Sequence, residues 1–279
     1  MISFPHAKIN IGLRICRKRP DGFHDIESVF CPVACCDALE ITPAPDGRMS
    51  FRQSGFPAGP SENNLVMKAY RLMDSRFGLP PLHIHLHKAI PSGAGLGGGS
   101  SDAAFCLRML NEIGELGISP PDLHEMAAEL GSDCPYFLQD KPAFVSGRGE
   151  VIEPFNLNLS AFFLLLVKPK RSVSTARAYS LVKPCMPKVD WTGLLDRHPG
   201  EWAPEVRNDF EITVMESLPE LQFISSQLAE MGAAFVSMSG SGSVVYGIFD
   251  EKPVFNMETF PGCWVWTSDD DYFGALRNR

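Results

Sequence analysis

The sequence predicts an α+β protein of two domains. Its 279 residues exceed the ~100–200 residues of one typical domain and fall short of three. Residues 8–15 alternate polar and apolar side chains, which is typical of a half-buried strand, whereas residues 64–77 repeat apolar side chains at helical spacing. The pattern changes to strands near residue 150, and we therefore expect domains over residues 1–155 and 156–279.

The expected strands follow from alternation or from short apolar runs. The Pro-Asp-Gly sequence at 20–22 predicts the turn of an N-terminal hairpin, because glycine accepts a positive φ. The longest apolar run, 161–167, is far shorter than the ~20 residues that span a bilayer, so we interpret it as a buried strand. The strands are expected at 8–15, 23–33, 82–87, 161–167 and 244–249.

The expected helices are bounded by residues typical of helix ends. Ser119, followed by two prolines, is a capping residue with proline in the first turn, and Gly78 and Gly232 are typical stops. The helices are expected at 64–77, 102–114, 119–131 and 219–231.

Composition argues against several classes of protein. The net charge of −8 opposes duplex binding, because phosphate contacts need clustered Lys and Arg. The one dense basic run, Arg14–Arg19, is interpreted as a solvated hairpin tip. Eight cysteines without C-x-x-C spacing, and an N-terminus unlike a signal peptide, predict reduced thiols in the cytoplasm. We expect no nucleic-acid, membrane or obligate protein partner.

Three histidines lie on one face of the strand expected at 82–87. His83, His85 and His87 alternate with Leu and Ile, so their imidazoles point to the same side. Three imidazoles so placed could bind zinc. The alternative is a strand with one polar face, and no further ligand lies nearby in the sequence.

The most informative segment is rich in glycine and lies between an expected strand and an expected helix. Glycine lets backbone N–H groups converge on a ligand, and the helix adds unsatisfied N–H groups and a positive dipole end. These features together predict a polyphosphate site rather than a flexible linker. The segment consists of Pro91, Ser92, Gly93, Ala94, Gly95, Leu96, Gly97, Gly98, Gly99, Ser100 and Ser101.

Two common phosphate loops do not fit this segment. A Walker A loop would need lysine where Gly99 stands. A dinucleotide fingerprint fits by count, but it needs an acidic residue ending a second strand about 20 residues later. That region, around Ile118–Pro121, has a helical pattern with prolines instead.

The loop resembles that of the galactokinase, homoserine kinase, mevalonate kinase and phosphomevalonate kinase superfamily. Its three glycines and two serines resemble the branch that phosphorylates a cytidine-diphosphate-linked methylerythritol in non-mevalonate isoprenoid synthesis. Four further segments agree: Ala7–Asn10 with Pro20–His24, Gly131–Phe137, Met238–Ser243 and, more weakly, Asn208–Glu211. The resemblance implies a ribosomal-protein-like nucleotide domain followed by a ferredoxin-like α/β sandwich domain.

The resemblance also implies catalytic residues. Asp133 would accept the proton of the attacking hydroxyl, and its alternative role is a helix N-cap. Lys8 would pair with Asp133 and offset negative charge; its alternative is a surface lysine on an edge strand.

ATP and Mg²⁺ are the implied cofactors. Besides the glycine loop, Lys88 would reach a phosphate, and Asn64 would lie near the adenine, with a helix cap as its alternative. No metal ligand is assigned, since ATP carries the Mg²⁺, although Ser100 offers a hydroxyl. Asp102 stands where the family commonly has Asn, and we expect it to cap the helix rather than face a cation.

The implied substrate residues lie in both expected domains. Phe23 replaces a common tyrosine and keeps the π-face for a cytosine ring. Tyr179 would be a second ring against cytosine, with a buried aromatic as its alternative. The full set is Asn10, Phe23, His24, Tyr179, Gly240 and Ser241. Two alternatives remain, namely a superfamily kinase for homoserine or mevalonate and, more remotely, a nucleic-acid-binding module.

Overall fold

The computed structural model describes residues 1–185, 189–256 and 258–268. Contacts divide the chain into two compact units that do not follow one cut along the sequence. The first unit contains residues 1–8, 35–92 and 97–140, and the second contains 9–34, 93–96 and 141–279. The predicted boundary between residues 155 and 156 stays a prediction.

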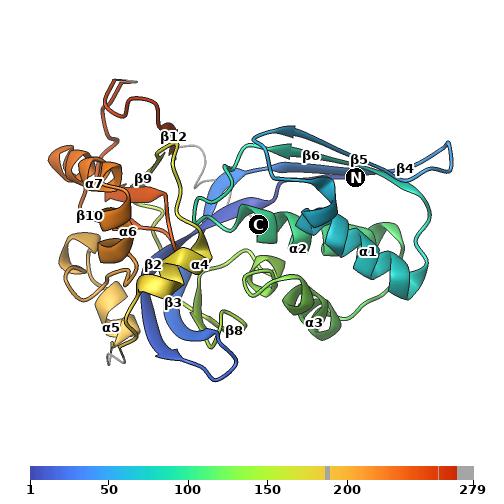
Figure 1. The fold of residues 1–279 in the computed structure, drawn as a ribbon, viewed down its shortest axis with the longest axis horizontal. Helices are drawn as coiled ribbons and strands as arrows, with labels where there is room; N and C mark the ends of the chain where they lie inside the picture. The colour runs from blue at the N-terminus through green and yellow to red at the C-terminus, as the bar shows by residue number, and fades with distance from the viewer. Residues whose placement is uncertain (186–188, 257, 269–279) are drawn as a thin grey trace. The chain divides into compact units, whose positions relative to one another are not determined.

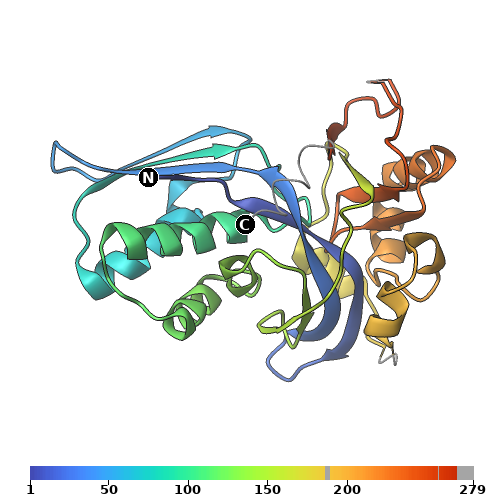
Figure 2. The same ribbon diagram turned by 180° about the vertical axis from the view of Figure 1, so that it is seen from behind.

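The first unit is a four-stranded sheet with helices on one face (Figures 1 and 2). Its strand order is β1-β4-β6-β5, and the last pair is parallel. The strands are β1 (Ile2–Ser3), β4 (Ala38–Pro43), β5 (Ser50–Gly55) and β6 (Leu82–Lys88). The helices are η1 (Ser61–Asn63), α1 (Leu65–Phe77), α2 (Gly98–Ile113), α3 (Pro120–Leu130) and η2 (Pro135–Leu138).

The core of the first unit explains this arrangement. The apolar positions of β6, Leu82, Ile84 and Leu86, are all buried against α1 and α2. The intervening histidines lie on the other face, where His83 bonds to Ser50, and His85 and His87 both bond to Ser54. No group of three or more His, Cys, Asp or Glu among the described residues could hold a metal ion. The histidine face is thus polar and hydrogen-bonded to serines, as the polar-face interpretation expects.

The second unit contains two sheets. The order β2-β3-β7-β8 joins β2 (His6–Lys18) and β3 (His24–Cys36) to β7 (Ala143–Ser146) and β8 (Val151–Pro154). The other sheet has the order β10-β11-β9-β12, from β9 (Phe163–Lys168), β10 (Phe235–Met238), β11 (Val245–Phe249) and β12 (Trp264–Thr267). The helices of the second unit are α4 (Thr175–Leu181), α5 (Trp191–Leu195), η3 (Pro199–Glu201), α6 (Glu211–Ser217) and α7 (Glu220–Glu230).

The predicted elements recur with shifted ends. The α1 helix begins after Asn64 and ends at Gly78, whose φ is 64°. The largest shift is in α2, which begins at Gly98 rather than at Asp102, because the run from Gly98 to Ser101 forms its first turn. No helix among the described residues is long and apolar enough to cross a membrane. The eight cysteines, all within the described ranges, form no disulfide there.

Candidate active site

The glycine loop connects β6 to α2 (Figure 1). Its conformation is fixed by left-handed backbone, since Gly93, Gly95 and Gly97 have φ of 62°, 77° and 70°. At Gly97 a Cβ would lie 2.6 Å from the Phe137 ring, so a side chain has no room there. The segment is thus a shaped turn and not a flexible linker.

The first turn of α2 offers hydrogen-bond donors. Gly97 is its N-cap, and no side chain caps the helix. The backbone N–H groups of a helix's first turn have no intrahelical partner, and they form the positive end of its dipole. Ser100 hydrogen-bonds with Cys134, and the buried hydroxyl of Ser101 has no partner among the described residues. Such a turn can hold a phosphate group.

Lys8 and Asp133 lie together in the first unit. Lys8 Nζ is 3.7 Å from Asp133 Oδ2; the side chain of Lys8 is 4% exposed and that of Asp133 33%. Burial lowers the pKa of Lys8, and the neighbouring Asp133 carboxylate opposes that shift. The pair thus combines an almost fully buried cation with a partly exposed proton acceptor, as general-base assistance to a hydroxyl requires.

Asp133 lies in the turn between α3 and η2. Gly131 ends α3, and the N–H of Cys134 donates to the Gly131 carbonyl over 3.1 Å. Cys134, rather than Asp133, is the N-cap residue of η2, and no side chain caps that helix. The N-cap alternative for Asp133 is therefore wrong, and its carboxylate is available to pair with Lys8.

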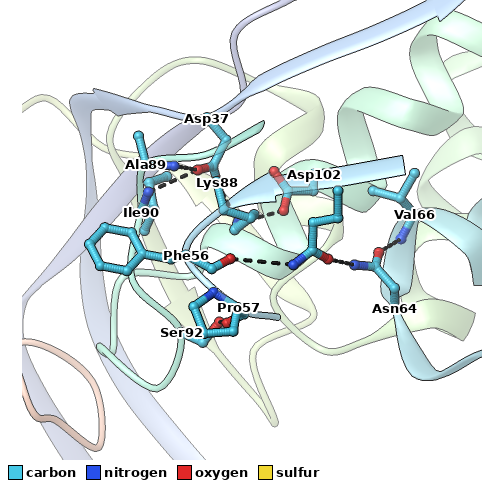
Figure 3. A network of polar contacts seen from close by, with 11 residues as sticks. Asp37, Phe56, Pro57, Asn64, Val66, Lys88, Ala89, Ile90, Ser92 and Asp102 are labelled. Carbon is cyan, nitrogen blue, oxygen red and sulfur yellow. Dashed lines mark hydrogen bonds and ion pairs between the residues drawn. The ribbon is translucent and has the colours of Figure 1, made fainter. Parts of the chain in front are cut away.

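Asn64 is a helix cap, as one of its two interpretations predicted. Its Oδ1 accepts from the N–H of Val66, and its Nδ2 donates to Gln53 Oε1 (Figure 3). Ser92, at the start of the loop, donates its hydroxyl to the carbonyl of Pro57. The contact of Asn64 with adenine stays a prediction.

Lys88 is buried between two carboxylates, Asp37 and Asp102 (Figure 3). The expectation that Asp102 caps α2 is wrong, because Asp102 lies in the second turn and pairs with a cation. Asp37 was missed, since it lies 51 residues from Lys88 and outside every motif. The one signal in the sequence is that Asp37 lies between apolar neighbours, Cys36 and Ala38, which is typical of a buried position.

Asn10, Gly240 and Ser241 lie in the second unit. The amide of Asn10 donates to Ser28 over 2.9 Å, and its backbone N–H donates to the Ser239 hydroxyl. Asn208, from the weakest of the sequence matches, donates to the carbonyls of Met238 and Gly240 and so fixes the C-terminal glycine loop. Ser241 shares a hydrogen bond with Thr175.

The aromatic residues expected to hold a base form two groups within the second unit. His24 and Tyr179 stack directly, with ring centroids 4.9 Å apart and an angle of 27° between planes. Stacked atoms sit about 3.5–4.0 Å apart, so no base fits between these two rings as they stand. Phe23 is 50% exposed and stacks against Arg148. Burial, together with Lys18, lowers the pKa of His24, which favours an uncharged ring.

Known proteins of one kinase family are similar to this chain over most of its length. Residues 64–148 match the GHMP kinases N terminal domain, and residues 193–258 match the GHMP kinases C terminal domain. The 4-diphosphocytidyl-2-C-methyl-D-erythritol kinase of Parabacteroides distasonis is 45% identical over 95% of this chain and 98% of its own. The enzyme of the same name from Bacteroides fragilis is 47% identical over 96% and 99%.

Solved structures agree with this similarity. A crystal structure of 4-(cytidine 5'-diphospho)-2C-methyl-D-erythritol kinase matches with a TM-score of 0.78 and 29% identity, over 96% of this chain and 98% of that one. The homoserine kinase of Cytophaga hutchinsonii matches with a TM-score of 0.63 and 15% identity, over 95% of each chain, which shows the shared fold alone. The predicted α+β two-domain kinase fold is confirmed.

Proposed function

Because the chain belongs to the 4-diphosphocytidyl-2-C-methyl-D-erythritol kinase family of GHMP kinases, we propose that it phosphorylates that diphosphocytidyl polyol. The chain is an ATP-dependent kinase with a small-molecule substrate. The reaction transfers the γ-phosphoryl group of ATP to a hydroxyl of the polyol and gives the 2-phosphate and ADP. It supplies an intermediate of non-mevalonate isoprenoid synthesis.

The observation that carries this proposal is the Lys8–Asp133 pair, which lies in the same unit as the first turn of α2. Asp133 takes the hydroxyl proton as the oxygen attacks, and the phosphoryl group passes through a loose, largely dissociative transition state. Lys8 places a positive charge beside the reacting groups. The loop and the α2 N-terminus hold the phosphates that remain on ADP.

Mg²⁺ is expected to accompany ATP. The described residues hold no cluster of three or more His, Cys, Asp or Glu that could bind it alone. A nucleotide-borne ion fits the hydroxyl of Ser100, because Mg²⁺ prefers oxygen ligands and keeps phosphates and waters around it. When bound, it would neutralise charge on the phosphates.

The substrate assignment uses the second unit. His24, Phe23 and Tyr179 are aromatic side chains that we propose contact the nucleobase from outside the His24–Tyr179 stack, whereas homoserine and mevalonate have no ring to stack on them. Asn10, Gly240 and Ser241 are proposed to contact the polyol or its diphosphate. We also place the reaction in the cytoplasm, which the eight reduced thiols support.

The test compares three alcohols side by side with the purified full chain. ADP release is measured with the diphosphocytidyl polyol, with homoserine and with mevalonate, and the product is identified by mass spectrometry. We expect turnover with the first alcohol only. Preferential turnover of homoserine or mevalonate would overturn the substrate assignment, and full activity in Asp133→Ala would overturn the role of Asp133.

A further inference from the structure

Three charged side chains form a buried cluster in the first unit. Lys88 Nζ contacts Asp37 Oδ2 and lies 2.6 Å from Asp102 Oδ2. The side chains of Lys88, Asp37 and Asp102 are 3%, 0% and 4% exposed. A lysine enclosed in this way has no open path to a ligand, so its function must act through its two partners.

The cluster joins the two ends of the glycine loop (Figure 3). Lys88 is the last residue of β6, three positions before Pro91, and Asp102 follows Ser101 in α2. The contact between Lys88 and Asp102 therefore joins the residues on either side of the loop.

Asp37 holds the entry to the loop by its other oxygen. Asp37 Oδ1 accepts hydrogen bonds from the backbone N–H groups of Ala89 and Ile90, over 2.6 and 2.8 Å. The backbone N–H of Asp37 donates to the carbonyl of Pro5, three residues before Lys8. One side chain thus fixes the turn that leads into the loop, and its backbone anchors the segment that leads to Lys8.

The charges of the cluster do not balance when both carboxylates are ionised. Burial lowers the pKa of Lys88, but Asp102 and Asp37 together raise it above its ordinary value, so the lysine remains a cation. Burial raises the pKa of Asp102 to about 8, with Lys88 opposing and Asp37 adding to the rise. Asp102 Oδ1 is buried without a partner among the described residues. One proton on Asp102 therefore makes the cluster neutral near pH 7.

We propose that Asp37, Lys88 and Asp102 are positioning residues that hold the entry and exit of the glycine loop in the conformation that binds ATP. Lys88 acts through this clamp and does not contact a phosphate. The proposal rests on ATP binding at the loop, which is part of the proposed function, but it does not depend on which alcohol is phosphorylated.

The competing assignment, a phosphate contact by Lys88, predicts a different pattern of variants. If Lys88 contacted ATP, Lys88→Met would weaken ATP binding, while Asp37→Asn would leave binding intact or improve it by releasing the lysine. If the three residues form one clamp, Asp37→Asn and Lys88→Met each weaken binding. The double variant then costs less than the sum of the two, because residues of one network are not additive.

The experiment measures the Kd of a non-hydrolysable ATP analogue by calorimetry for the full chain and for Asp37→Asn, Lys88→Met and the double variant. Asp46→Asn is the matched control, since Asp46 is an exposed aspartate of the same unit. We expect Kd and the KM for ATP to rise about tenfold or more in both single variants, because small misplacements of a binding loop are costly. The KM for the alcohol should stay near that of the unmodified chain, and Asp46→Asn should bind as that chain does.

A pH series separates positioning from simple loss of stability. Asp102 faces Lys88, Asp37 and, on its own helix, Cys106. In the unmodified chain the KM for ATP should rise above pH 8 as the cluster gains a negative charge. Asp102→Asn keeps an acceptor for Lys88 without a titrating group, so it should bind ATP at pH 7 and lose this rise.

Three results would overturn the proposal: Asp37→Asn with unchanged Kd for the analogue, additive effects in the double variant, or a pH-dependent rise in KM that persists in Asp102→Asn. If Lys88→Met does not fold, Asp37→Asn and Asp102→Asn still decide the question. If the unmodified chain did not bind the analogue, that result would instead contradict the proposed ATP site itself. Binding of the analogue without phosphorylation of the polyol would leave the clamp intact and contradict only the substrate.

Discussion

Two lysines of the first unit, Lys8 and Lys88, are both buried beside carboxylates, but the carboxylates differ in distance and in exposure. Lys8 Nζ lies 3.7 Å from the carboxylate of Asp133, whose side chain is one-third exposed. Lys88 has two closer partners, and all three side chains are nearly inaccessible. Burial lowers the pKa of Lys8, whereas the paired carboxylates raise that of Lys88.

The difference shows that a lysine–carboxylate contact can serve either the reaction or the structure of the loop, depending on how tightly it is packed. A long contact to a solvated carboxylate leaves that carboxylate able to take a proton. A closed ion cluster can take no part in the reaction, and breaking it leaves an uncompensated buried charge. The same residue types therefore serve the reaction at one position and the shape of the loop at the other.

The largest expected effect is on turnover in Asp133→Asn. An amide has the shape of the carboxylate but cannot accept the proton, so kcat should fall by about 10²–10⁴-fold. The affinity for an ATP analogue should remain that of the unmodified chain. Steady-state ADP release and calorimetry check the two quantities. A fall in ATP affinity equal to the fall in kcat would show that Asp133 supports the structure, and it would contradict the distinction between the Lys8–Asp133 pair and the Lys88 cluster.

Lys88→Met should destabilise the first unit. Removing the cation leaves the buried carboxylate of Asp37 without its counter-charge, and breaking a buried pair typically costs about 3–5 kcal/mol. Thermal melts of the variant and the unmodified chain measure this loss. The Lys88→Met and Asp37→Asn double variant should regain part of it. An unchanged melting temperature in Lys88→Met would show that the cluster does not hold the fold.

Lys8→Met should separate activity from stability in the opposite way. Loss of the charge beside the reacting groups should lower kcat by about 10²–10³-fold. The melting temperature should not fall, because burial already opposes the charged form of Lys8 and Asp133 stays hydrated. Activity assays and thermal melts on one preparation give both results. A large loss of stability in Lys8→Met would show that Lys8, like Lys88, stabilises the fold.

A further effect concerns how the stability of the fold changes with pH. The pKa of Asp102 is raised in the folded chain to about 8, from about 3.9 in an unfolded one. The folded state therefore binds a proton that the unfolded state has released, and this contribution to stability is lost as pH rises from about 4 through 8. Denaturant titrations across this range should show a shallower decline for Asp102→Asn. Identical declines would place the titrating group elsewhere.

Features carried by local sequence were predictable. The alternation of 82–87, the cap at Asn64 and the stop at Gly78 each act within a few residues, and the structure has β6 and α1 there. The glycine loop was expected from its composition and its place between a strand and a helix, and the Lys8–Asp133 pair from the family resemblance. The two side chains of that pair lie 3.7 Å apart. The assigned roles of the site residues remain predictions.

Features made by distant pairing were not predictable. β5 lies in a stretch rich in polar residues, Pro and Gly, and its one neighbour in the sheet is β6, with which it pairs in parallel. Gly55 shows the tightness of that pairing, since a Cβ there would overlap the backbone of Lys88. Asp37 and Lys88 are far apart in the sequence, and neither residue alone indicates a buried ion pair. The start of α2 inside a glycine run likewise reverses the intrinsic preference of glycine against helix.

The eight thiols have a practical consequence for chemical modification. Burial raises the pKa of Cys31, Cys35 and Cys134 to about 12, so at neutral pH these groups hold almost no thiolate, the form that reacts with alkylating reagents. Cys185 is exposed. A maleimide dye should therefore attach first at Cys185, without prior removal of the buried cysteines.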